Sequence, residues 1–280
     1  MQNRDAQKQI YGGTYTFRED KHVHAFNGDN LNGVTTLKSK ILANHALRNW
    51  FTTEPLGVMG WYNPKSAYYQ ARKENISKDD WLAMKEQKRK DIFAAISSGT
   101  YEKYCNLLDM AREATDFKKN NAAEWGSRVH DACEQYIKTG EVTDEHDIAP
   151  SVQHFADWLA QTNAKVLHCE TNMMSKEWWT GGIVDLILEI DGKLYIADIK
   201  TSSGIYSDMF LQMGAYDKMQ YEMGMFDKYA DGYIIINLKK DHTIATEFMH
   251  LTEPCREAYD AIVNLHKSYS TVCEARGEKL

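Results

Sequence analysis

The residues of this sequence whose types and spacing could do chemistry are two aspartates and a lysine on a predicted β-hairpin. Asp191-Gly192 separates two apolar runs, and this dipeptide favours a two-residue turn that fixes the register of the strands. In that register Asp185 and Asp198 lie opposite each other, with Cβ atoms about 5 Å apart, and Lys200 follows on the same face. Two facing carboxylates repel unless one is protonated or a cation lies between them. The sequence therefore predicts a site for a hard divalent cation such as Mg²⁺, where Lys200 could assist an attacking water or balance charge on a phosphate oxygen.

The alternative for the same three residues is structural. Asp198 and Lys200 would form an ordinary ion pair, and Asp185 would face solvent on a half-exposed sheet. The matched register favours the metal site, because two unrelated aspartates have no reason to meet across a hairpin.

A helix is expected to bring a histidine to this site. Asn121 and Glu124 have the spacing of a capping box, which predicts a helix that begins there and ends near Lys138. Gly126 would let the helix approach the sheet closely, so that His130 could bind the metal through one imidazole nitrogen. A satisfied structural histidine is the alternative.

Three further polar residues are candidates for the same site. Glu170, on the preceding predicted strand, could supply a third acidic group or lie on the exposed face. Gln212 and Tyr216 are spaced i, i+4 on a predicted helix, and they could contact a nucleic-acid phosphate or base or only solvate that helix.

Short β-branched and aromatic segments separated by turn residues predict the elements that hold these residues. The first part of the chain is predicted mostly helical, with one strand at 14–17, and an α/β or α+β fold results, a small mixed sheet flanked by helices. We expect a helical N-terminal elaboration in residues 1–120 and a catalytic core in 121–280, or a single domain. The predicted strands span 166–174, 182–190, 194–200, 233–238 and 243–248, and the later helices span 205–226 and 253–274.

The charged residues are unevenly distributed along the chain. Residues 1–130 carry 20 basic and 15 acidic side chains, whereas residues 131–280 carry 13 and 25. This asymmetry predicts a first part that faces a polyanion, with Lys88, Arg89 and Lys90 as candidate phosphate contacts; a solvated helix face is the alternative for this basic run.

No apolar run approaches the ~20 residues that span a bilayer, and the first residues lack the apolar region of a signal peptide. We therefore expect a cytoplasmic protein with no membrane partner. The five cysteines form no CxxC pair, so they signal neither a disulfide framework nor a zinc or iron–sulfur site.

Five motifs, in this order and on these predicted elements, resemble those of the PD-(D/E)XK nuclease superfamily, in particular its RecB-like and phage exonuclease branch. The segment Gly33-Val-Thr-Thr36, followed by Leu47-Arg-Asn-Trp50, is also similar to the opening of phage-encoded members. The motifs are Gly126-Ser-Arg-Val-His130, Glu170, Gly182-Ile-Val-Asp185, Asp198-Ile-Lys200-Thr-Ser and Gln212-Met-Gly-Ala-Tyr216.

The resemblance implies a PD-(D/E)XK core that binds Mg²⁺ or Mn²⁺, and it assigns roles to individual residues. The metal ligands would be His130, Asp185, Asp198 and the main-chain carbonyl of Ile199. The catalytic residues would be Asp185, Asp198, Lys200 and Glu170, and the DNA contacts would include Gln212, Tyr216 and Thr36. An iron–sulfur cluster, which some relatives carry, is not expected because the late cysteine cluster is missing.

The expected function is a metal-dependent deoxyribonuclease, an exonuclease of phage recombination or replication type in the cytoplasm of a bacterial host. DNA would be its substrate, and a helicase or a single-strand annealing protein its partner, since the chain has no helicase motif. The alternatives are a flap or branch endonuclease on the same fold, and a nucleic-acid-binding protein that has lost catalysis.

Overall fold

The computed structural model describes residues 5–42, 55–99 and 101–278. These residues form two units: one comprises the described parts of 1–43 and 126–280, and the other those of 44–125. The expected division at residue 120 differs from this one mainly in the placement of the first 43 residues. Leu47–Trp50, part of the motif similar to phage-encoded nucleases, lies outside the described residues.

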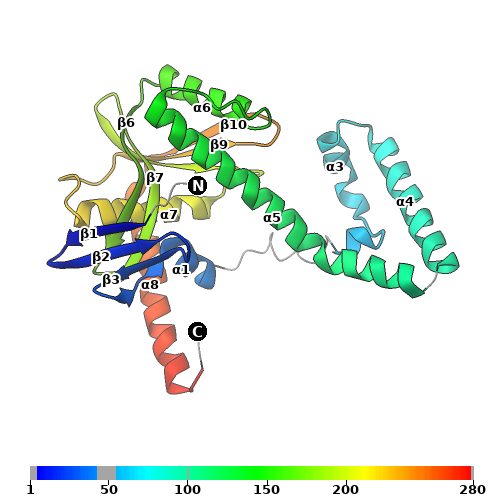
Figure 1. The fold of residues 1–280 in the computed structure, drawn as a ribbon, viewed down its shortest axis with the longest axis horizontal. Coiled ribbons are helices and arrows are strands. Elements are labelled where there is room, and N and C mark those ends of the chain that lie inside the picture. The colour runs from blue at the N-terminus through cyan, green and yellow to red at the C-terminus, as the bar shows by residue number, and fades with distance from the viewer. Residues whose placement is uncertain (1–4, 43–54, 100, 279–280) are drawn as a thin grey trace. The chain divides into compact units, whose positions relative to one another are not determined.

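A six-stranded mixed sheet forms the centre of the first unit (Figure 1). Its order is β10-β9-β8-β7-β5, with β6 paired to β7. The pairs β5–β7 and β8–β9 are parallel, and the others are antiparallel. All five strands predicted after residue 165 are confirmed, and β5 is an addition. The strands are β5 (Asn32–Gly33), β6 (Lys165–Ser175), β7 (Thr180–Ile190), β8 (Lys193–Lys200), β9 (Gly232–Leu238) and β10 (Ile244–Met249).

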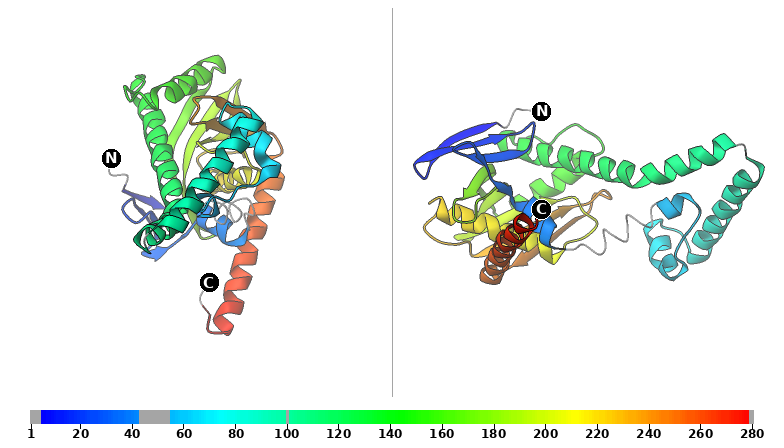
Figure 2. Two further views of the ribbon diagram at one scale, coloured as in Figure 1. Left: turned by 90° about the vertical axis from the view of Figure 1, so that its right-hand side faces the viewer. Right: turned by 90° about the horizontal axis from the view of Figure 1, so that it is seen from below.

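Helices flank this sheet, as the predicted α+β fold requires. A single buried apolar cluster joins the sheet to α1 (Val34–Ile41), α7 (Ser207–Glu222) and α8 (Thr252–Ala275). A separate helix, α6 (Ala149–Gln161), contacts β9 and β10. Figures 1 and 2 show α7 beside the sheet and α8 extending past it toward the C-terminus. None of the helices in the described ranges is both long enough and apolar enough to cross a membrane.

A second, four-stranded antiparallel sheet precedes α1. The strand predicted at 14–17 is confirmed, but the other three strands of this sheet, in residues 6–30, were not predicted. Two of the sheet's three turns have two residues, Tyr11-Gly12 and Asn27-Gly28, and all four residues have positive φ, as a two-residue turn of type I′ requires. The sheet packs directly on β7, because a Cβ added at Gly181 would lie 2.7 Å from the Cβ of His24. Its strands are β1 (Ala6–Ile10), β2 (Gly13–Arg18), β3 (Val23–Phe26) and β4 (Asp29–Asn30).

The second unit is built from helices. It contains the 3₁₀ helix η1 (Pro64–Ser66), then α3 (Ala67–Lys73) and α4 (Lys78–Ser98). Ser77 caps α4 by accepting a hydrogen bond from the backbone N–H of Asp80. Its buried apolar cluster is small: Ala67, Ala71 and Trp81, with Tyr62 and Leu82 packed against them.

Helix α5 (Tyr101–Thr139) contributes residues to both units. The predicted start at Asn121 is wrong, since this residue lies inside the helix. The segment from Tyr101 to Trp125 contains neither Gly nor Pro, so nothing in it ends a helix, and a capping pattern inside good helix formers stays helical. The end is close to the predicted one, because Gly140 has φ +74° and its N–H bonds the carbonyl of Tyr136.

Candidate functional site

The predicted hairpin forms in the predicted register. Asp191 and Gly192 have φ values of 51° and 72°, and β7 pairs with β8 from Ile190–Lys193 to Leu186–Ala197. That ladder stops one position before Asp185 and Asp198. Strand β8 continues beside β9 as far as the Lys200–Asn237 pair, so β7 and β8 part where the two aspartates begin.

The Asp185 side chain fills the place where the two strands part. Its Oδ2 accepts a hydrogen bond of 2.8 Å from the backbone N–H of Ile199, so a carboxylate takes the N–H that a continued ladder would have given to a backbone carbonyl. Only 14% of the Asp185 side chain is exposed, which differs from the solvent-facing position of the structural alternative. Ile199 thus contributes its N–H here, and a metal-binding role for its carbonyl stays a prediction.

Three side chains predicted from the sequence meet at this point. His130 Nδ1 lies 3.6 Å from Asp185 Oδ2, and one ligand atom from each of His130, Glu170 and Asp185 lies within 4.8 Å of the others. One imidazole nitrogen and two carboxylates suit a divalent cation that prefers nitrogen and oxygen ligands. The three residues come from α5, β6 and β7, so the cluster depends on the tertiary fold.

Glu170 reaches the cluster through an unusual backbone conformation. The pairs Cys169–Leu186 and Thr171–Val184 flank it, and they place Glu170 opposite Asp185. Its φ is +45°, a left-handed value that is uncommon for a residue with a Cβ and that persists only when the surrounding structure enforces it.

Asp198 and Lys200 form a buried ion pair beside the three-residue cluster. Lys200 Nζ lies 2.6 Å from Asp198 Oδ2, and Asp198 is 1% exposed. Neither carboxylate oxygen of Asp198 has a partner with hydrogen-bond geometry in the part of the chain that the structure describes. The ion pair of the structural alternative is therefore present, but it leaves Asp198 Oδ1 buried and unsatisfied, which is costly without a further ligand.

Burial and neighbouring charges act in opposite directions on the pKa values of Asp198 and Lys200. Burial raises the pKa of Asp198 above its ordinary value, although the Lys200 ammonium acts in the other direction. For Lys200, burial lowers the pKa, but the carboxylates of Asp198 and Asp185 outweigh it and the pKa is raised. Lys200 is thus a cation at neutral pH.

Close contacts at two glycines hold the helices against the sheet around the cluster. A Cβ added at Gly126 on α5 would lie 2.8 Å from Thr201 Oγ1, so the predicted close docking of this helix is confirmed. A Cβ at Gly182 on β7 would lie 2.7 Å from Cε1 of Tyr216. Because a larger residue at either position would push the helix away, both glycines help to fix the geometry of the site.

Gln212 and Tyr216 lie inside the protein. They are 6% and 4% exposed, and Gln212 Nε2 donates a 3.0 Å hydrogen bond to the Tyr216 hydroxyl. Burial, followed by the charges of Asp198 and Asp185, raises the pKa of Tyr216, so this hydroxyl is a neutral group close to both aspartates. Their burial contradicts the alternative that they only solvate the helix, and contact with DNA stays a prediction.

The other predicted DNA contacts are exposed. Thr36 lies on α1, and Lys88, Arg89 and Lys90 lie on α4 in the second unit. Thr36 belongs to the same unit as the cluster, whereas the three basic residues belong to the other unit.

The sequence analysis missed Asn237, which pairs with Lys200 across the parallel β8–β9 ladder. Asn237 is fully buried, and within the described residues neither its Oδ1 nor its Nδ2 has a hydrogen-bond partner. Residues in register on neighbouring strands share a face, so Asn237 faces the same side as Lys200. A polar residue near the end of the apolar segment 233–238 was the available signal.

Comparison with known proteins adds no family. No protein-family model and no curated protein matches the chain. A solved structure, described as the crystal structure of SSO0001, aligns with 52% of this chain and 74% of its own, at 16% identity and a TM-score of 0.29. A similarity this low carries no functional argument, so the function is argued below from the site.

Proposed function

We propose that the chain is a metal-dependent nuclease that hydrolyses phosphodiester bonds in DNA, with exonuclease action of recombination or replication type. One observation carries the proposal: the possible metal ligands His130, Glu170 and Asp185 converge beside the buried Asp198–Lys200 pair. The motif resemblance, which uses the same five residues, supports the proposal independently of the geometry.

The residues fit a hard divalent cation such as Mg²⁺ or Mn²⁺. His130, Glu170 and Asp185 would hold it, and Asp198 would add a buried oxygen that has no hydrogen-bond partner within the described ranges. A bound divalent cation supplies Lewis acidity and makes water a nucleophile near neutral pH. The carboxylates also favour a cation electrostatically, because Lys200 balances only one of them.

Lys200 has a separate task in this proposal. As an ammonium group whose pKa is raised by Asp198 and Asp185, it keeps its proton and would stabilise negative charge on a phosphate oxygen as the phosphorus is attacked. Asp198 holds the Lys200 side chain through the 2.6 Å contact. Proton removal by Lys200 is disfavoured while both carboxylates are charged.

End-labelled single-stranded and double-stranded DNA, incubated with Mg²⁺, Mn²⁺ or EDTA, tests the proposal. We expect cleavage with metal and none with EDTA. Asp198→Asn and Lys200→Ala should each lower the rate by about 10²-fold or more, since each removes a charge that acts in the transition state. Asp191→Asn, the same chemical change in the turn of the same hairpin, should cleave like the wild type.

Several outcomes would contradict parts of this assignment. Undiminished metal-dependent cleavage by Asp198→Asn would exclude the site. Cutting of circular single-stranded DNA would replace exonuclease with endonuclease action. Tight DNA binding without turnover in any metal would leave a nucleic-acid-binding protein on this fold.

A further inference from the structure

Two open hollows flank one tryptophan in the second unit, far along the sequence from the metal-ligand cluster. Their volumes are about 520 and 630 Å³, and both are lined by Gly60 and Trp61. The first also contains Lys85, Lys88 and Lys118, and the second Arg89 and Lys90. We call these seven residues the Trp61 surface.

Trp61 is presented to solvent by a fixed turn. Its side chain is 45% exposed, while its backbone N–H donates a 2.8 Å hydrogen bond to the carbonyl of Leu56. Gly60 before it has φ +85°, and a Cβ there would lie 3.2 Å from the Cδ1 of Ile92. This turn strongly favours glycine, so an indole is held in the open between the hollows rather than buried in a core.

The charges around Trp61 are mostly positive. Five basic side chains line the two hollows, against the carboxylates of Glu74 in the first and Glu86 in the second. Contacts with rings hold two of the cations in place: Lys85 Nζ lies 5.2 Å from the centre of the Trp81 ring, and the Arg89 guanidinium 5.3 Å from that of Tyr62. Such contacts order a side chain and leave its charge intact.

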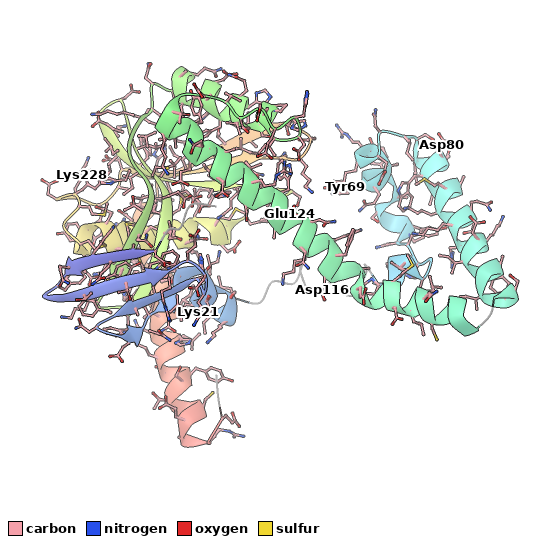
Figure 3. All side chains as sticks on the ribbon, in the orientation of Figure 1. Lys21, Tyr69, Asp80, Asp116, Glu124 and Lys228 are labelled. Atoms are coloured by element: carbon pink, nitrogen blue, oxygen red, sulfur yellow. The ribbon has the colours of Figure 1, made fainter. Side chains whose placement is uncertain are left out.

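Other exposed aromatic side chains of this unit differ from Trp61 in their relation to the two hollows. Tyr68 and Tyr69 on α3 are 69% and 61% exposed and line neither of them, whereas Phe93 on α4 is 73% exposed and lines the second. Figure 3 shows the side chains of α3 and α4, with Tyr69 and Asp80 labelled. Trp61 differs from these three residues because it lines both hollows and so has basic side chains on both sides.

We propose that the Trp61 surface binds single-stranded nucleic acid, with one base stacked on Trp61 and phosphates on either side of it in the two basic hollows. Sites that bind single strands combine an aromatic platform with a basic groove, and this surface has both parts. Duplex DNA fits poorly, because its bases are stacked on one another and offer no free face to an indole. The inference rests on the proposed nuclease function only in treating the bound strand as a substrate.

Fluorescence anisotropy with a labelled oligothymidylate and the full-length protein, in EDTA so that no cleavage occurs, tests this site. Replacing Trp61 with Ala should weaken binding by about 5- to 150-fold, the range for loss of one stacked base, and Trp61→Phe should restore most of it. Lys88→Gln should weaken binding and lower the slope of log K against log salt by about 0.7. The controls are Tyr68→Ala and Lys78→Gln, which change an exposed ring and an exposed lysine that line neither hollow.

Equal binding by wild type, Trp61→Ala and Lys88→Gln would overturn the proposal. A blunt-ended duplex that binds more tightly than the single strand would overturn it as well, in favour of duplex recognition. The result is independent of the nuclease assay: loss of binding in Trp61→Ala stands even if the wild type cleaves nothing, and cleavage with unaltered Trp61→Ala binding refutes this surface alone.

Discussion

Asp185→Asn tests the metal-ligand cluster without requiring any catalytic activity. The amide oxygen of Asn can still accept the hydrogen bond from Ile199 N–H that Asp185 Oδ2 accepts at 2.8 Å. The β7–β8 arrangement should therefore survive, while the Asp185 position of the three-residue cluster loses its negative charge. Because the side chain is only 14% exposed, water cannot fully replace the missing charge.

The expected size of the effect follows from linkage. A metal present at 100 times its dissociation constant stabilises the folded protein by about 2.7 kcal/mol, which corresponds to a rise in Tm of roughly 5–10 °C for a unit of this size. The ligand atoms lie within 4.8 Å of one another, so a cation held among them would lie within that distance of the Asp185 carboxylate. At about 4 Å, two unit charges interact by about 4 kcal/mol at an effective dielectric constant of 20. Removing the Asp185 charge should thus weaken metal binding by more than about 100-fold. The remaining stabilisation at the same metal concentration is then about 0.4 kcal/mol or less.

Differential scanning fluorimetry with Mg²⁺ or Mn²⁺, against EDTA, measures this difference. The wild type should show the full metal-dependent rise in Tm, and Asp185→Asn about 1 °C or less. Asp191→Asn is the matched control, since Asn tolerates the left-handed conformation of this turn residue, and its metal-dependent shift should equal that of the wild type. An unreduced shift in Asp185→Asn would refute the cluster as the metal site.

Two further predictions concern the packing around the site. Burial, with a smaller contribution from His22, lowers the pKa of His24 to about 4. The unfolded chain therefore binds an extra proton between about pH 4 and 6.5, and the free energy of unfolding should fall by up to about 3 kcal/mol as the pH drops through this window. In urea titrations, the free energy of unfolding of His24→Gln should depend less on pH than that of the wild type. An equal pH dependence of the two proteins would contradict the assignment. Gly182→Ala should lower the free energy of unfolding by about 1–3 kcal/mol, because the new Cβ would lie 2.7 Å from Tyr216; an unchanged denaturation midpoint would show that α7 can move away without cost.

The parts of the site that local sequence determines were predictable. Asp191-Gly192 sets the hairpin turn by its own backbone preference, so the β7–β8 register could be worked out residue by residue. Strand β9 was predicted from its short β-branched run between turn residues, and helix α7 lies within the helix predicted at 205–226. In each case the signal and the structure it specifies lie within a few residues of each other.

The remaining features depend on contacts between distant segments. The bulge between Val166 and His168 and the positive φ of Glu170 set which residue faces Asp185, and neither has a local sequence signal. Strand β5 has two residues and exists because it pairs with Thr180 and Gly181. The Asn27-Gly28 turn did have a local signal, but the strands that it joins, β3 and β4, have four and two residues, which is too short for a clear strand pattern.

The buried Asp198–Lys200 pair is itself an argument that the site has a ligand. Apolar residues of similar volume in place of a buried ion pair often leave a protein equally or more stable, so packing alone gives no reason for charges at this position. Here the pair is also incomplete, since Asp198 Oδ1 has no hydrogen-bond partner among the described residues, and Asp185 on the neighbouring strand β7 adds a second carboxylate. A cation bound at the cluster would satisfy that oxygen and offset the unbalanced carboxylates at once. Stability of the metal-free protein should therefore rise, and cleavage be lost, when Asp198 and Lys200 are replaced together by Leu and Met.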